Sequence, residues 1–182
     1  RGILADEYGV DLDRVTWVLS GDEHVAEYEP PANVVPVGEG EDIAQLLAAG
    51  ELAAAIGVEV DHPDVAPLIP DAEEAGFAAL QRSGHYPINH LVVVKDELLD
   101  AHPELAGAVF EAFAAAKSLY LERVALDPVH ERVRQITGGD PLPYGLEPNR
   151  ATIEELIRHA VSQKILASAP VVDELFAEVS ET

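Results

Sequence analysis

Short apolar segments alternate with helix-like segments along the chain, and this alternation most restricts the folds that it can adopt. The segment Arg14 to Leu19 alternates apolar and polar residues, as a half-buried strand does. Residues 33–37 predict a second short strand, while residues 38–52 and 71–84 have the apolar spacing and the closing glycines of helices. Strands bracketed by helices predict an α/β fold, with a mainly parallel or mixed sheet and helices on both faces.

The later segments continue the same pattern. The small apolar residues 52–57 and the run His90 to Val94 each predict a short buried strand. Pro103 marks the first turn of a long helix, and the last third is helical except for the Gly- and Pro-rich loop 137–150.

Composition and charge exclude several classes of protein. The 182 residues, 48% of them hydrophobic, suffice for one ordinary core or two small lobes, and no stretch is apolar enough for membrane insertion. The absence of cysteine excludes disulfides and thiolate metal sites and is compatible with either cytoplasm or periplasm. A formal charge of -23 argues against nucleic acid as a partner, because the phosphate backbone would be repelled.

Three segments are candidates for a ligand site in such a fold. Ligands of α/β sheets bind beyond the carboxyl ends of strands and beside helix N-termini. The predicted helix start at Arg1, the loop "GHYPINH" (84–90) and the loop "YGLEPNR" (144–150) occupy such places. The first loop concentrates polar side chains directly before an apolar run, which favours a position at a ligand or at water.

Several motifs, in order along nearly the whole chain, resemble the 4,5-dihydroxyphthalate decarboxylase-like family. They are "RGILADEYGV" (1–10), "VTWV" (15–18), "GHYPINH", "YGLEPNR" and "DELF" (173–176). The family resembles type II periplasmic solute-binding proteins, so the resemblance implies their two-lobed fold. It also implies that the N-terminal part of the first lobe is missing, that residues 1–79 form most of the second lobe and that residues 80–90 cross the hinge. Residues 91–182 would then complete the first lobe and add the C-terminal helices.

The resemblance implies decarboxylation of 4,5-dihydroxyphthalate, or of a related hydroxylated aromatic acid, to protocatechuate and CO₂ by ring protonation. A hydroxyl para to each carboxylate provides the electron sink, so no cofactor is required. His85 and His90 are the expected acid and base, because imidazole exchanges protons near neutral pH. Asn89 would bind substrate beside them, since a hinge crossing runs along the cleft. The alternative is that His85 is merely exposed and His90 satisfies a backbone carbonyl.

Arginine suits the two carboxylates of such a substrate, because its guanidinium binds a carboxylate in bidentate fashion. Arg1 is the first candidate, with Arg82 and Arg150 behind it. The alternatives are that Arg82 only caps a helix C-terminus and that Arg150 pairs with Glu154 one turn on.

Tyr144 and Asn149 are further candidates, as donors to a ligand oxygen. The alternative is that they serve a tight turn and the N-cap of the last long helix. No histidine spacing matches a known metal motif, so no metal site is expected.

A solute-binding protein of an ABC transporter is the alternative function. It would close its lobes on a small anionic or aromatic solute and deliver it to a permease, without chemistry. The enzyme is expected in the cytoplasm and the binding protein in the periplasm or another extracytoplasmic place. In both cases the expected partner is a small aromatic carboxylate or other small anion.

Overall fold

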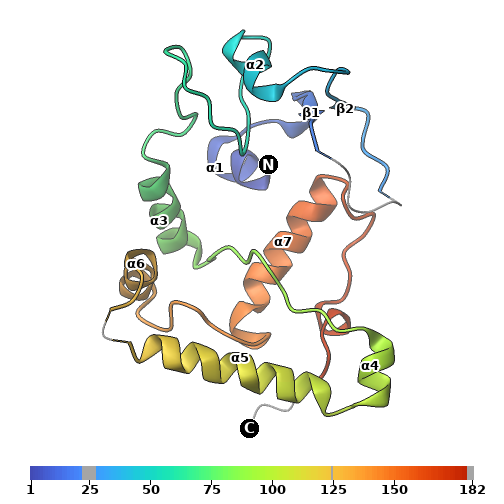
Figure 1. Ribbon diagram of the computed structural model, residues 1–182, viewed down its shortest axis with the longest axis vertical. Helices are drawn as coiled ribbons and strands as arrows, with labels where there is room; N and C mark the ends of the chain where they lie inside the picture. Colours follow the sequence, from blue (N-terminus) through green and yellow to red (C-terminus); the bar gives the residue numbers. More distant parts are fainter. Residues whose placement is uncertain (22–27, 124, 180–182) are drawn as a thin grey trace. The chain divides into compact units, whose positions relative to one another are not determined.

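The computed structural model describes residues 1–21, 28–123 and 125–179 (Figure 1). Its helices are α1 (Gly2–Tyr8), α2 (Ile43–Ala48), α3 (Ala72–Ser83), α4 (Asp96–Ala101), α5 (Leu105–Leu121), α6 (Pro128–Thr137) and α7 (Arg150–Ser162). Its strands are β1 (Trp17–Leu19) and β2 (Val34–Pro36), and its 3₁₀ turns are η1 (Leu12–Arg14), η2 (Glu147–Asn149) and η3 (Val172–Leu175). The chain is therefore a mixed α/β protein, as expected.

The chain divides into two compact units. Unit 1 contains residues 1–72 and 158–168, and unit 2 contains residues 73–157 and 169–182. Helix α7 begins in unit 2 and ends in unit 1, because the division falls between Ile157 and Arg158. The lobe boundaries implied by the family resemblance stay predictions.

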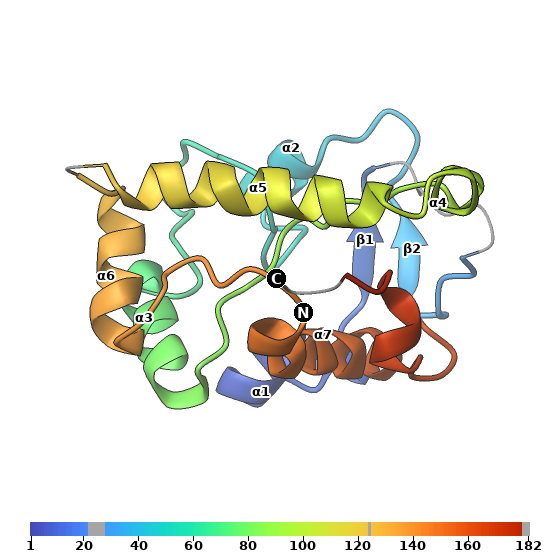
Figure 2. The same ribbon diagram turned by 90° about the horizontal axis from the view of Figure 1, so that it is seen from below.

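Unit 1 holds the small sheet, in which β1 and β2 pair in parallel with Trp17 opposite Val34 (Figure 2). Both strands were predicted, and the pairing ends at Pro36, which has no N–H to donate. The side chain of Asn33 fastens the entry to β2, because its Nδ2 donates to the carbonyl oxygens of Leu12 and Val15 at 3.1 and 3.0 Å.

Helix α1 ends at a glycine. Gly9 takes the left-handed conformation, with φ of 65°, and its N–H donates to the carbonyl of Ala5. Glycine adopts this conformation without the steric cost of a Cβ, which makes it a common helix terminator.

Unit 2 has a compact apolar core between α3 and α6, which lie side by side in Figures 1 and 2. Phe77 and Leu80 of α3 pack with Val133 of α6, and Tyr86 and Ile136 cover the cluster. The helical spacing of the apolar residues puts them on one face, and their burial removes that face from water.

Two predicted strands are not strands in the structure. Residues 52–57 and 91–94 form no regular element, and Ile56 and Val93 are 72% and 88% exposed. The expectation of buried strands there was wrong, because an apolar run becomes a strand only when another segment takes up its N–H and C=O groups. Within the described residues, no segment pairs with either run.

The predicted long helix forms as α5, but it begins at Leu105, so Pro103 precedes its first turn, and its apolar residues are only partly covered. Leu105, Val109 and Tyr120 are half-buried, while Phe113 is 49% exposed. In the described ranges, no helix combines the length and apolarity needed to cross a bilayer.

Candidate functional site

Arg1 is the predicted site residue with the most distinctive surroundings. Its guanidinium carbon lies 4.4 Å from the centroid of the Trp17 ring, a cation–π contact within unit 1. No carboxylate in the described residues pairs with this guanidinium, although the chain has 34 acidic residues. The Arg1 side chain is thus held by an aromatic ring while its N–H donors remain available to an anion.

A small hollow in unit 1 opens beside this contact. Arg1, Trp17, Asn33 and Lys164 are among its lining residues, and its volume is about 20 Å³. That volume accommodates about one water-sized group. The hollow therefore suits a single polar group of a ligand better than a whole aromatic ring.

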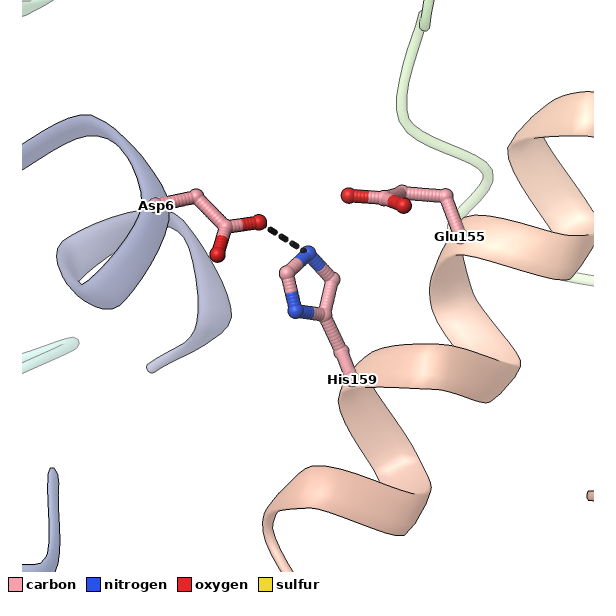
Figure 3. A group of neighbouring side chains, drawn as sticks. All are labelled: Asp6, Glu155 and His159. Carbon is pink, nitrogen blue, oxygen red and sulfur yellow. Dashed lines mark ion pairs between the residues drawn. The ribbon is translucent and has the colours of Figure 1, made fainter.

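A histidine–carboxylate pair also lies in unit 1, on α1 and α7 (Figure 3). His159 Nε2 lies 3.6 Å from Asp6 Oδ2, and Arg158 forms an ion pair with the same carboxylate. The ring of His159 packs directly on Gly2, where an added Cβ would lie 2.1 Å from Nδ1. The glycine of the "RGIL" motif is therefore needed because the imidazole occupies the space of a side chain.

Asp6 and His159 are the donors that unit 1 offers to a metal ion. A third donor, Glu155, comes from the stretch of α7 that belongs to unit 2 (Figure 3). Protein metal sites need three or four ligands, and the Asp6 carboxylate already pairs with Arg158. Unit 1 by itself therefore does not supply a set of metal ligands within the residues described.

The "GHYPINH" loop lies in unit 2. His85 is half-buried, and its Nδ1 lies 3.3 Å from Thr152 Oγ1 on α7. Asn89 and His90 are exposed. His90 is therefore exposed to solvent, and His85 contacts α7. Each arrangement is compatible both with a proton donor and with a purely structural histidine.

The "YGLEPNR" and "DELF" motifs meet within unit 2 through one ion-pair group. Arg150 Nη2 lies 2.6 Å from both Glu147 Oε1 and Asp173 Oδ1. In the described part of the chain these are its carboxylate partners, and the expected pairing with Glu154 was wrong. The hydrogen bonds to Asp173 and Glu147 raise the pKa of Arg150, and those from Arg150 lower the pKa of Asp173.

The remaining predicted residues have mainly local contacts. Asn149 Nδ2 donates to the carbonyl oxygens of Pro143 and Gly145 at 2.9 and 2.8 Å, so this side chain holds its own loop. The Tyr144 ring packs at 4.8 Å on Phe110, and burial raises the pKa of its hydroxyl. Arg82 is exposed in the last turn of α3.

Of the eight predicted site residues, Arg1 belongs to unit 1 and the other seven belong to unit 2. The sequence suggested that His159 is a surface residue or a helix cap, and it did not indicate Lys164; these residues lie in or just after α7. The spacing of Glu155 and His159, one helical turn apart, was a visible signal. Nothing in the sequence indicated that His159 contacts Asp6, because 153 positions separate the two residues.

A curated protein is similar to this chain, the 4,5-dihydroxyphthalate decarboxylase of Comamonas testosteroni. The two are 28% identical over an alignment of 181 residues, which covers 86% of this chain and 55% of the relative. The chain thus spans about half the length of the curated relative that it matches. No family model matches the chain.

Proposed function

We propose that this chain belongs to a carboxy-lyase that removes CO₂ from 4,5-dihydroxyphthalate or a related hydroxylated aromatic acid. The observation that carries the proposal is the similarity to the named decarboxylase, which extends over 86% of the chain. The guanidinium of Arg1 supports it, since no carboxylate of the described residues pairs with this group and a dianionic aromatic acid needs cationic groups to bind a protein of charge -23.

The chemistry of this substrate needs few groups from the protein. A proton adds to the ring carbon that bears the carboxylate, while the hydroxyl para to it loses a proton and takes up the ring charge as a dienone. The C–C bond to the carboxylate then breaks, CO₂ leaves, and its bonding electrons restore the aromatic ring. An acid, a base and cations for the carboxylates therefore suffice.

The proposed roles follow the side-chain chemistry. Arg1 binds a carboxylate, while His85 and His90 supply the acid and the base. Asn89 and Arg82 are proposed as further contacts to the substrate. Arg150 is the weakest of the proposed binders, because two carboxylates already occupy its guanidinium.

A two-lobed fold of the type II solute-binding kind is part of the proposal. The run Leu91 to Val93 supports it, since these side chains are 57%, 56% and 88% exposed. Neighbouring exposed apolar residues are typical of a surface that another segment covers. The relative is nearly twice as long as the region matched, so we propose that the longer protein supplies the segments that cover this run.

The test is CO₂ release from 4,5-dihydroxyphthalate by the longer protein. We expect turnover that the double variant His85→Ala, His90→Ala reduces by about 100-fold or more, the usual contribution of general acid–base groups. The matched control is His102→Ala, which removes an exposed histidine of unit 2 whose Nδ1 lies 3.6 Å from Glu104 Oε1. Absence of turnover by the unsubstituted protein would refute the proposal, and equal rates in all three proteins would refute the assigned histidines.

A further inference from the structure

We propose that the hollow in unit 1 is a subsite for one carboxylate group of an aromatic acid, held by Arg1 and Lys164 beside Trp17. The choice of an aromatic acid rests on the proposed function. The subsite itself rests on the residues around the hollow, all of which lie in unit 1.

Arg1 provides the first cation. Three other arginines of the chain, Arg132, Arg134 and Arg150, hold carboxylates at 2.5 to 2.6 Å and are neutralised by them. The Arg1 guanidinium instead packs on Trp17, which restricts its position, and no carboxylate among the described residues pairs with it. A guanidinium fixed in advance loses less conformational entropy when it binds a carboxylate.

Lys164 provides the second cation. Its Nζ lies 3.8 Å from Asp13 Oδ1, and the two side chains are 65% and 85% exposed, so this ion pair is weak. The residue has φ of 60°, a left-handed conformation that glycine or asparagine takes more readily after a helix. The charged residues that line the hollow are Arg1, Lys164 and Asp13, so the lining has a net charge of about +1. This charge favours a group with one negative charge.

The size of the hollow selects the part of the ligand that enters. About 20 Å³ admits carboxylate oxygens but no benzene ring. Ser162 and Gln163, also at the hollow, are polar and can donate hydrogen bonds to such oxygens. We therefore expect the ring of the ligand to remain outside, with one carboxylate inserted.

Trp17 makes the subsite directly observable, because it is the single tryptophan of the chain. The experiment titrates the protein with phthalate at low salt and follows tryptophan emission, with Trp17→Phe providing the background. We expect a saturable change, and an affinity about tenfold lower in Arg1→Gln and in Lys164→Gln, since each variant removes a charge-assisted hydrogen bond and tenfold corresponds to about 1.4 kcal/mol. Benzoate should bind as well, and benzamide, which is neutral, should not.

The matched control is Arg14→Gln, which removes the same charge from an exposed side chain of unit 1. Equal affinities of Arg1→Gln and Arg14→Gln for phthalate, or equal binding of benzoate and benzamide, would overturn the subsite. Phthalate lacks the hydroxyl groups that decarboxylation needs, so the titration is independent of turnover. Saturable binding without CO₂ release from 4,5-dihydroxyphthalate would support the subsite and refute the proposed function. CO₂ release without any change in Trp17 emission would support the proposed function and refute the subsite.

Discussion

Each unit contains an arginine packed on an aromatic ring, and the two contacts differ in what else the arginine binds. In unit 2, the guanidinium of Arg132 lies 4.1 Å from the Phe77 ring, and both of its terminal nitrogens donate to Glu74 at 2.5 Å. In unit 1, Arg1 lies 4.4 Å from the Trp17 ring and has no carboxylate partner among the described residues.

The presence or absence of a carboxylate partner distinguishes an arginine that stabilises the fold from one that can bind a ligand. Arg132 connects α6 to α3 with its charge compensated, over the buried ring of a core residue. Arg1 has a similar aromatic support, but within the part of the chain that the structure describes no carboxylate pairs with it. The same side-chain chemistry therefore serves stability in unit 2 and recognition, as we propose, in unit 1.

The largest expected effect comes from the ring beneath Arg132. Phe77→Ala should lower the free energy of unfolding of unit 2 by about 3–5 kcal/mol, because it removes a buried aromatic side chain and leaves a cavity. Urea unfolding followed by circular dichroism measures the change. A loss below about 1 kcal/mol would show that unit 2 does not depend on this core.

Gly2→Ala tests the packing of the His159 ring on Gly2, the residue that follows Arg1. The new Cβ would collide with the ring of His159, so we expect a loss of about 1–3 kcal/mol in unit 1 and a displaced imidazole. Urea unfolding and the histidine NMR signals report these changes. Gly76→Ala in α3 is the control, since open space surrounds its Cβ position, and it should leave stability unchanged or slightly higher.

Two substitutions, Arg132→Gln and Arg1→Gln, test whether the first arginine stabilises the fold and the second binds a ligand. Arg132→Gln should lower the Tm by a modest amount, because it breaks the exposed pair with Glu74 and the contact with Phe77. Arg1→Gln should lower the Tm less, because it removes only the contact with Trp17 and no described ion pair, and it should weaken phthalate binding. The reverse pattern in thermal unfolding would exchange the roles that we assign to the two arginines.

The smallest effect concerns pH. The hydrogen bond from Arg132 lowers the pKa of Glu74 below its usual value, so its folded-state pKa lies below the unfolded value of about 4.3. The pair therefore stabilises unit 2 above that pH, and the contribution is lost as the pH falls through the folded pKa. Stability measured between about pH 6 and pH 3 should decrease less in Glu74→Gln than in the unsubstituted protein; parallel pH curves for the two proteins would contradict this prediction.

Helices were predictable from the sequence to a degree that strands were not. The spacing of Ile153, Leu156, Ile157 and Val161 predicts a helix, because a helix makes its hydrogen bonds within its own segment, and α7 buries Ile153 and Ile157 but leaves Leu156 55% exposed. The run His90 to Val94 looked like a strand, but a strand makes its hydrogen bonds with a second segment. Local periodicity has no information about whether such a partner is present.

The candidate site also contains features that the sequence predicts and features that it does not. The sequence indicated Arg1 as the first binder of a carboxylate, from its residue type and its place at a helix start. That its guanidinium would rest on Trp17 beside Lys164 could not be predicted, because these residues are brought together by the path of the chain. The contact of His159 with Asp6 could not be predicted for the same reason.

The sequence by itself determined the acidic charge, the absence of cysteine chemistry, the positions of most helices and the resemblance to a decarboxylase family. The tertiary structure decided which charges are compensated. Arg150 is neutralised by Asp173, 23 positions away, whereas Arg1 is not neutralised by any residue described. The physical reason is that charge is a property of a side chain, while its compensation depends on distances of a few ångström that only the folded chain sets.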